Sequence, residues 1–242
     1  MITLNADMGE SFGIHSFGHD DELVKLIDIA NIACGFHAGD PGSMRRTIAL
    51  CAQAGVAVGA HPGLPDLVGF GRREMRLEPD EVTDLVRYQV GALMSFIQDA
   101  GLALNHIKPH GALYGMTARD ASLMRGVCNV AQQFEVPVLG LPGTQHEKVA
   151  AEYGLRFVAE FYVDLEYADD GSLLIERRPH TTPPDVAAQR ARRILARNEV
   201  VTRSGRALTT RADTICVHAD ASNAVEVALA VRDVLSEAHQ TS

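Results

Sequence analysis

Short apolar runs alternate with longer amphipathic stretches along almost the whole chain, and this alternation restricts the fold more than any other feature. Such apolar runs predict buried strands, and stretches with apolar residues at helical spacing predict helices that cover them. The expected strands lie at residues 2–5, 29–34, 56–60, 104–108, 136–141, 156–161 and 214–218. About seven β/α units favour a closed or distorted β/α barrel over an open, doubly wound sheet.

Residues 165–212 interrupt this alternation of predicted strands and helices. Asp169-Asp170-Gly171-Ser172 stands between two extended runs, and Ser204-Gly205 stands between two more, so each pair of runs predicts a hairpin. No low-complexity linker or change of composition marks a domain boundary. We therefore expect residues 1–242 to form a single β/α barrel domain with a hairpin-containing insertion at about 165–212.

Composition argues against several classes of protein. A net charge of −9 disfavours nucleic-acid binding, and no apolar stretch is long enough to span a bilayer. A secretory signal is not evident, and the four cysteines are far apart without a C-x-x-C pair, which fits a reducing compartment. We expect a cytoplasmic protein that binds a small molecule rather than nucleic acid or a membrane. The sequence has no G-x-G-x-x-G or P-loop motif, so nucleotide binding by this chain alone is not expected.

Polar side chains directly follow most of the predicted strands, and several stand beside glycines. They are Asp7 and Glu10, His37 and Asp40, His61, Lys108 and His110, Glu160 and Asp164, and His218 and Asp220. The carboxyl ends of strands in parallel α/β folds meet on one face, which is where such folds do chemistry. The residues that we expect to line one pocket and to be catalytic are Asp7, His37, His61, Lys108 and His110.

A second set of residues is expected to bind the substrate. It comprises Glu10, Asp40, Arg72, Arg73, Glu160, Asp164 and His218. An arginine in the Gly-Phe-Gly-Arg-Arg loop suits a substrate carboxylate, although a salt-bridged surface loop is the alternative. Asp40, followed by Pro41, is also a sound helix cap. A lysine at the end of a strand, as at Lys108, is costly to bury unless a carboxylate pairs with it.

These groups together suit a hydrolytic reaction. A carboxylate or imidazole can activate water, a lysine or histidine can stabilise an oxyanion, and an arginine can hold an acidic group of the substrate. Asp7, His37 and His61 also match an Asp/His/His metal site with open positions. The residue pattern leaves both the metal-dependent and the metal-free versions open.

The same segments resemble the LamB/YcsF family. Cys34–Asp40, reading Cys-Gly-Phe-His-Ala-Gly-Asp, and Lys108–Tyr114, reading Lys-Pro-His-Gly-Ala-Leu-Tyr, are its most specific strings, and the matching segments run in order from Asn5 to Asp220. The resemblance implies a seven-stranded β/α barrel of the glycoside hydrolase/deacetylase type. It also implies the hydrolytic A subunit of 5-oxoprolinase, which opens 5-oxo-L-proline to L-glutamate with ATP and with partner subunits B and C. Because an ATP motif is lacking here, ATP is expected to be bound by or with those partners.

One segment departs from the family pattern. The family usually has Phe-Ala-Asp-Arg where this chain has Tyr162-Val163-Asp164-Leu165, so Leu165 replaces an arginine. This difference leaves open an enzyme for another lactam or amide. A free-standing metal-dependent deacetylase or amidohydrolase is a further alternative, and a non-enzymatic binding or scaffolding protein is another.

Overall fold

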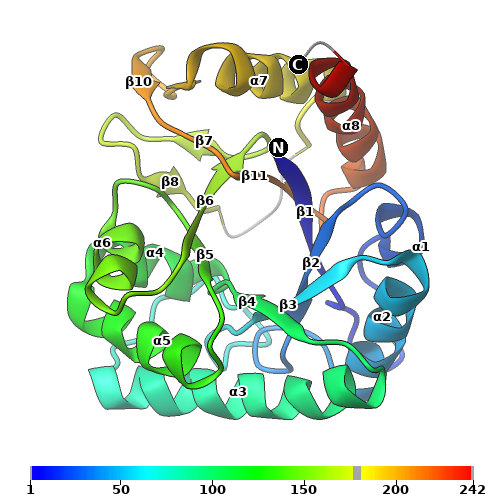
Figure 1. Cartoon of the computed structure of the whole chain (residues 1–242), viewed down its shortest axis with the longest axis vertical. Helices are drawn as coiled ribbons and strands as arrows, with labels where there is room; N and C mark the ends of the chain where they lie inside the picture. The colour runs from blue at the N-terminus through cyan, green and yellow to red at the C-terminus, as the bar shows by residue number, and fades with distance from the viewer. Residues whose placement is uncertain (1, 177–180, 241–242) are drawn as a thin grey trace.

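A closed barrel of seven parallel strands forms the centre of the protein, with the strand order β1-β11-β6-β5-β4-β3-β2 (Figure 1). The computed structural model describes residues 2–176 and 181–240. The barrel strands are β1 (Thr3–Met8), β2 (Ile29–Ala33), β3 (Ala57–His61), β4 (Leu104–Ile107), β5 (Val138–Gly140), β6 (Phe157–Tyr162) and β11 (Thr214–His218). Each of them overlaps one predicted strand, and the predicted seven-stranded β/α barrel is confirmed.

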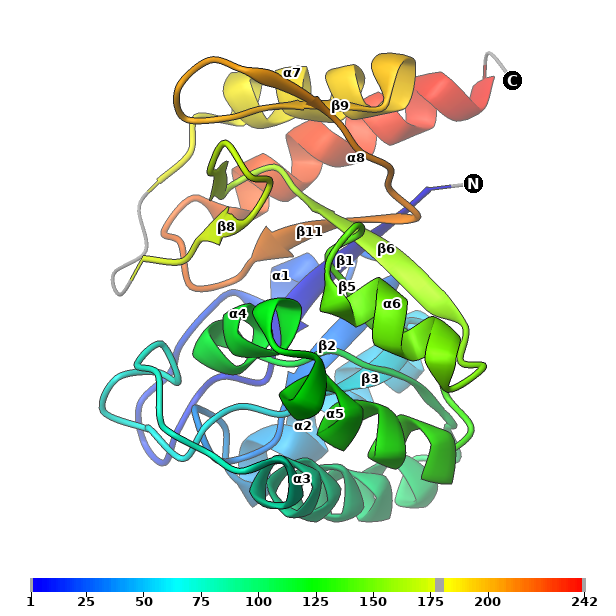
Figure 2. The ribbon, with the colours of Figure 1, turned by 90° about the vertical axis from the view of Figure 1, so that its left-hand side faces the viewer.

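Helices cover the outside of this barrel. They are α1 (Asp20–Leu23), α2 (Pro41–Ala54), α3 (Pro79–Asp99), α4 (Gly111–Arg119), α5 (Ala121–Gln133), α6 (Gln145–Glu152), α7 (Pro184–Arg197) and α8 (Ala224–Gln240). Figures 1 and 2 show α7 and α8 together on one side of the barrel and α3 on the other, where it packs against α5. None of the helices in the described ranges is long and apolar enough to cross a membrane.

Two short antiparallel hairpins flank α7. β7 (Glu166–Tyr167) pairs with β8 (Leu173–Leu174), and β9 (Glu199–Val201) pairs with β10 (Ala207–Thr209). The sequence predicts both hairpins because each turn carries a glycine between two extended runs. The β7–β8 hairpin bears on the site described below, since it brings apolar side chains to the cavity there.

Helix α4 is the element that the strand and helix pattern does not predict. It begins directly after His110, and its residues Ala112, Leu113, Tyr114, Met116 and Thr117 are all buried. A helix buried on most of its surface lacks the one-sided apolar spacing by which a surface helix is recognised. Its short sequence therefore predicts a polar loop after a strand rather than a helix.

The interior of the barrel is polar beneath the carboxyl ends of its strands. The Asn31 amide donates to Asn5 Oδ1 and to Asp7 Oδ1, each at 2.8 Å. His106 Nε2 lies 2.7 Å from Asn31 Oδ1. A Cβ atom at Gly59 would lie only 2.0 Å from the His106 ring, so the glycine makes room for this imidazole. This buried hydrogen-bonded layer fixes the position of Asp7.

Candidate active site

A cavity of about 630 Å³, its open mouth included, lies at the carboxyl ends of the barrel strands. Its polar lining comprises Asp7, His61, Arg72, Lys108, His110, Asp164, Glu176, His218 and Asp220, and its apolar lining includes Tyr114, Tyr162, Leu165, Leu173 and Ile175. Charged groups and apolar side chains in one cavity suit a compact, polar substrate with a hydrocarbon part.

The buried ammonium group of Lys108 is the centre of the charged floor. Its Nζ lies 2.7 Å from Asp7 Oδ1, 2.8 Å from Glu160 Oε1 and 3.2 Å from Cys216 Sγ. The Tyr162 hydroxyl donates to the second oxygen of Glu160 at 2.6 Å. We call Asp7, Lys108, Glu160 and Tyr162 the Lys108 centre.

The charges of the Lys108 centre stabilise one another. Burial disfavours the ammonium ion, but Asp7 and Glu160 outweigh that effect and hold the pKa of Lys108 well above its ordinary value. Burial likewise disfavours the Asp7 carboxylate, yet His61 and Lys108 hold the pKa of Asp7 well below its ordinary value. At neutral pH the floor therefore presents an ammonium ion beside an ionised carboxylate.

His218 adds a second positive charge to the same floor. Asp164 accepts the backbone N–H of His218 at 2.7 Å, and its other oxygen lies 3.0 Å from His218 Nδ1. Burial opposes the imidazolium, but Asp164 raises the pKa of His218 to about 9. The other ring nitrogen, Nε2, lies 3.7 Å from Asp7 Oδ2. A protonated imidazole thus faces Asp7 at neutral pH.

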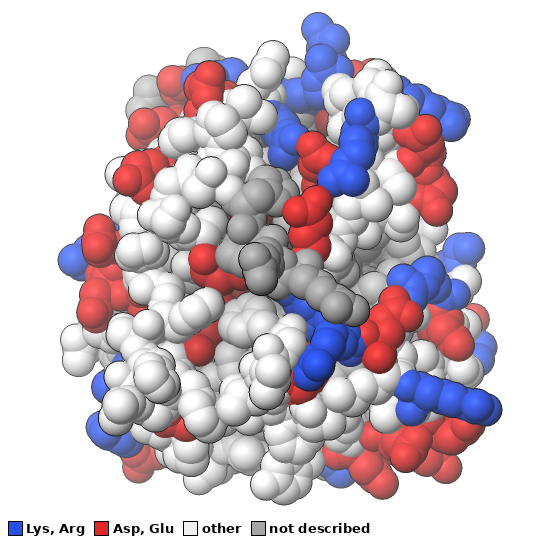
Figure 3. Space-filling view, turned by 180° about the vertical axis from the view of Figure 1, so that it is seen from behind, with Lys and Arg blue, Asp and Glu red and all other residues white. Residues whose placement is uncertain are grey.

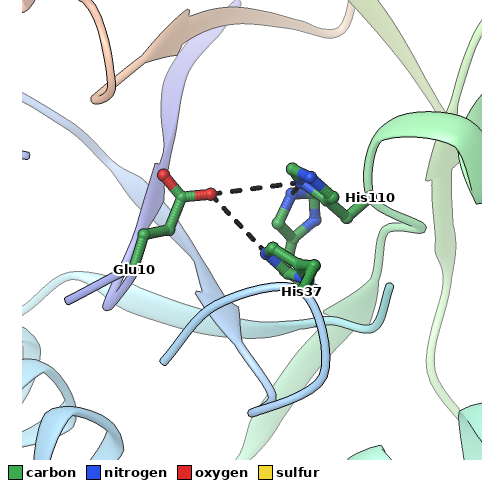
Figure 4. A group of neighbouring side chains, drawn as sticks. Glu10, His37 and His110 are labelled. Carbon is green, nitrogen blue, oxygen red and sulfur yellow. Dashed lines mark hydrogen bonds and ion pairs between the residues drawn. The ribbon is translucent and has the colours of Figure 1, made fainter. Parts of the chain in front are cut away.

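A group of four buried side chains adjoins the Lys108 centre, and we call Glu10, His37, His61 and His110 the histidine cluster. Their ligand atoms all lie within 4.8 Å of one another. The His37 and His110 rings are stacked, with centroids 3.6 Å apart and an interplanar angle of 5°. Glu10 Oε1 lies 3.6 Å from His37 Nε2 and 4.0 Å from His110 Nδ1 (Figure 4). These side chains can hold a metal ion.

His37 is the least satisfied member of the cluster. It is fully buried, and neither of its ring nitrogens has a hydrogen-bond partner among the described residues. Such unmade hydrogen bonds cost roughly 1–3 kcal/mol each. The loop above it packs closely, because a Cβ atom at Gly71 (φ +64°) would lie 2.6 Å from His37 Cβ. Burial lowers the pKa of His37 well below its ordinary value, so the ring is neutral.

Asp7, Cys216 and His218 form a second group whose ligand atoms lie close together. The Lys108 ammonium already contacts two of its members, Asp7 at 2.7 Å and Cys216 at 3.2 Å. A metal ion there would be repelled by that charge. Of the two groups, the histidine cluster is therefore better suited to a cation.

The structure brings most of the predicted site residues together. The predicted catalytic residues Asp7, His61, Lys108 and His110 line the cavity, as do the predicted substrate-binding residues Arg72, Asp164 and His218. His37 and Glu10 lie beside the lining, where His37 stacks on His110. Glu160 is buried against Lys108. The predicted metal set Asp7–His37–His61 is divided, because Asp7 falls in one group of ligands and the two histidines fall in the other.

Of the four predicted substrate-binding residues that do not line the cavity, Glu10 and Glu160 lie beside it, whereas Asp40 and Arg73 have other partners. Asp40 caps α2, accepting the backbone N–H of Ser43 at 2.9 Å, and it also accepts that of Gly13 at 2.7 Å. Arg73 forms an ion pair with Asp66, and its side chain is 48% exposed. The neighbouring Arg72 does line the cavity and pairs with Asp220 at 2.6 Å. Asp40 thus has the helix-capping position that its Pro41 neighbour suggests.

The sequence pattern did not reveal several side chains of the site. Tyr162 belongs to the Lys108 centre, Cys216 contacts it, and Tyr114, Leu173 and Ile175 line the cavity. Two of them could have been found from the geometry of a strand, because residues two positions apart on a strand point to the same face. Cys216 precedes His218 by two residues on β11, and Tyr162 follows Glu160 by two on β6. Leu173 and Ile175 carry no such signal, since the fold of the β7–β8 hairpin brings them there.

Known proteins resemble this chain over nearly its whole length. The sequence model of the LamB/YcsF family matches residues 2–242. A Thermus thermophilus protein, named as the A subunit of 5-oxoprolinase, is 46% identical over 241 residues, covering 98% of this chain and 96% of that protein. The Emericella nidulans lactam utilization protein lamB is 44% identical over 238 residues, covering 97% and 94%. The crystal structure of the lactam utilization protein from Thermus thermophilus matches with a TM-score of 0.90 and 45% identity, covering 98% of this chain and 97% of that one.

Proposed function

This chain belongs to the LamB/YcsF family, and from that premise we propose that it is the hydrolytic A subunit of a 5-oxoprolinase, which opens 5-oxo-L-proline to L-glutamate. The observation that carries the chemistry is the Lys108 ammonium, held 2.7 Å from the Asp7 carboxylate on the floor of the cavity. One of these relatives is named as a 5-oxoprolinase subunit and two are named as lactam utilization proteins. These names support a cyclic amide as the substrate.

The reaction adds water across the lactam C–N bond. Asp7, ionised at neutral pH, accepts a proton as water attacks the carbonyl carbon. The Lys108 ammonium stabilises the oxyanion that forms on the carbonyl oxygen. The His218 imidazolium, 3.7 Å from Asp7, donates a proton to the ring nitrogen as the C–N bond breaks. The product then carries one new carboxylate and one new amino group, as glutamate does.

Arg72 is the proposed partner of the substrate carboxylate. It lines the cavity, and its side chain is only 9% exposed. Guanidinium groups bind carboxylates through two parallel hydrogen bonds in one plane. Such bidentate binding would also fix the orientation of the lactam ring. Leu165, Leu173 and Ile175 form an apolar wall for the ring methylenes. Because Leu165 stands where the family usually has arginine, a lactam with a less polar substituent is the alternative substrate.

We propose that ATP is bound and used by, or together with, partner subunits B and C in the cytoplasm. Several relatives are named as the A subunit of 5-oxoprolinase, which supports the existence of further subunits.

The loops after β1 and β3 carry exposed apolar side chains, among them Ile14 at 96% and Val68 at 92% exposed. Exposed apolar groups that cluster on a surface are typical of protein interfaces. Acidic and basic side chains are interspersed on the face in Figure 3, which favours a protein partner over nucleic acid.

An assay with and without partners tests this proposal. The purified chain alone should neither hydrolyse ATP nor release glutamate from 5-oxoproline, and adding subunits B and C should produce both activities. Robust glutamate release by the chain alone would contradict the dependence on partners. ATP hydrolysis by the full complex without glutamate release would instead assign another lactam as the substrate.

The histidine cluster favours one second candidate, a free-standing metal-dependent deacetylase or amidohydrolase. Three imidazoles and a carboxylate with ligand atoms inside 4.8 Å include the three nitrogen and oxygen ligands that a catalytic zinc site uses beside a water molecule. A bound metal ion would polarise an amide carbonyl or lower the pKa of a bound water. Amide hydrolysis by the isolated chain that stops on chelation and returns with metal would support this candidate over the first.

A further inference from the structure

The hydrogen bonds of two histidines in the cluster fix where their protons lie. His61 Nδ1 lies 2.8 Å from the carbonyl oxygen of Lys108, and His110 Nε2 lies 2.8 Å from that of Phe70. A carbonyl oxygen can only accept a hydrogen bond, so each of these nitrogens carries a proton. In the neutral rings, the lone pairs are therefore on the opposite nitrogens, His61 Nε2 and His110 Nδ1.

These two remaining nitrogens face each other at 2.9 Å. Two lone pairs at that distance repel each other unless a positive species lies between or beside them. A shared proton is one such species, and a metal ion bound by both nitrogens is another. Two nitrogens bound to one tetrahedral ion at about 2.0–2.1 Å lie roughly 3.3–3.4 Å apart, so binding of an ion by both nitrogens requires them to separate by only about 0.4 Å.

The rest of the cluster favours the metal ion over the proton. A proton between His61 and His110 would leave His37 buried, with no hydrogen-bond partner for either nitrogen among the described residues. It would also leave the Glu10 carboxylate 3.6 Å from His37 Nε2, too far for a hydrogen bond. A metal ion gives all four side chains a common partner, and Figure 4 shows Glu10 directed towards both His37 and His110.

We propose that Glu10, His37, His61 and His110 bind one divalent transition-metal ion. Three imidazole nitrogens and one carboxylate oxygen suit Zn²⁺ and its neighbours in the first transition row, whereas Mg²⁺ and Ca²⁺ prefer oxygen ligands throughout. His61 and His110 also donate their outer N–H groups to backbone carbonyls, which is typical of metal-binding histidines because it orients the ring.

The site is placed to influence the cavity. His61 Nε2 lies 3.2 Å from Asp7 Oδ2, so the ion would border the Lys108 centre. The loop after β3 covers the cluster, with the Phe70 ring edge-on to both His37 and His110 at 5.7 and 5.2 Å. Such a covered site should exchange its ion slowly. The inference is independent of the proposed reaction, because it concerns binding by the chain alone.

Metal binding by the untagged chain tests the inference. We expect about one equivalent of Zn²⁺ per chain by elemental analysis, and one binding event by calorimetry after the protein has been stripped with a chelator. His37→Phe keeps a ring stacked on His110 but removes both nitrogens. Since loss of an outer partner alone costs roughly 10–100-fold in affinity, loss of a ligand should weaken Zn²⁺ binding by at least about a hundredfold. His15→Ala, which removes an exposed imidazole, should leave binding unchanged.

Two results would overturn the inference. One is a stripped protein that binds neither Zn²⁺ nor Mn²⁺, with ¹⁵N spectra that show a proton shared by His61 and His110. The other is Zn²⁺ binding of equal strength in wild type and His37→Phe. A protein that binds Zn²⁺ at this site but releases no glutamate with its partners would support the inference and contradict the proposed function, so the two failures are distinguishable.

Discussion

The Lys108 centre and the histidine cluster are neighbours of similar burial, yet they balance their polar groups in different ways. In the Lys108 centre an ammonium ion pairs with two carboxylates at 2.7 and 2.8 Å. In the histidine cluster a neutral imidazole has no hydrogen-bond partner in the described chain, and two ring nitrogens meet at 2.9 Å. The first region contains its own cation, and the second has the geometry of a site that receives one. The chain thus keeps buried charges that neutralise one another apart from groups suited to binding a cation.

Removal of the ammonium group should have the largest effect on stability. Lys108→Met leaves the carboxylates of Asp7 and Glu160 buried without their cation, which typically costs about 3–5 kcal/mol. Urea unfolding should show this loss, whereas Lys148→Met, at an exposed lysine, should change stability by less than about 0.5 kcal/mol. Adding Glu160→Gln to Lys108→Met should restore part of the loss. An equally stable Lys108→Met protein would show that the centre does not depend on this charge.

The next effect is a pH dependence that comes from His218. Its pKa is raised from 6.5 to about 9, so the protonated ring stabilises the folded state fully below pH 6.5, and this contribution is lost as the pH rises through about 9. The shift corresponds to roughly 3 kcal/mol. The unfolding free energies of wild type and His218→Gln should therefore converge between about pH 6 and pH 10. A constant difference would mean that His218 is neutral in the folded protein.

The smallest effect is expected at His37 in metal-free protein. Because relief of the unmade hydrogen bonds of its two nitrogens opposes the cost of fitting a larger phenyl ring into a packed site, His37→Phe should change the unfolding free energy by less than about 1 kcal/mol, in either direction. Thermal unfolding in the presence of a chelator measures this directly. A loss of several kcal/mol would show that the imidazole makes contacts in the metal-free protein, and the contrast with Lys108 would disappear.

Much of the fold could be predicted from the sequence, for a physical reason. Strands buried on both faces, such as Thr214–His218, leave a clear apolar run, and capped helices such as α3, which begins at Pro79, have local start signals. The gathering of Asp7, His61 and Lys108 was also predictable, because parallel strands end on one face. These features depend on local pattern and on the topology of the fold.

What could not be predicted depends on side-chain geometry. Arg72 and Arg73 are adjacent in sequence, yet Arg72 lines the cavity and Arg73 pairs with Asp66 beside it. The grouping of Glu10 with three histidines, rather than of Asp7 with two, follows from the stacking of His37 on His110 and from the hydrogen bonds to backbone carbonyls. Sequence spacing carries no information about ring orientation or about which ion pair forms.

Glutamate release by an Asp7→Asn variant tests most directly the claim that the Lys108 centre is where the lactam is opened. The asparagine keeps the shape of the side chain but cannot accept the proton of an attacking water. In complex with subunits B and C, the variant should release glutamate at least about a hundredfold more slowly than wild type, with an unchanged circular dichroism spectrum. Asp99→Asn, at an exposed position at the end of α3, should be fully active. Near-normal glutamate release by Asp7→Asn would contradict the assignment.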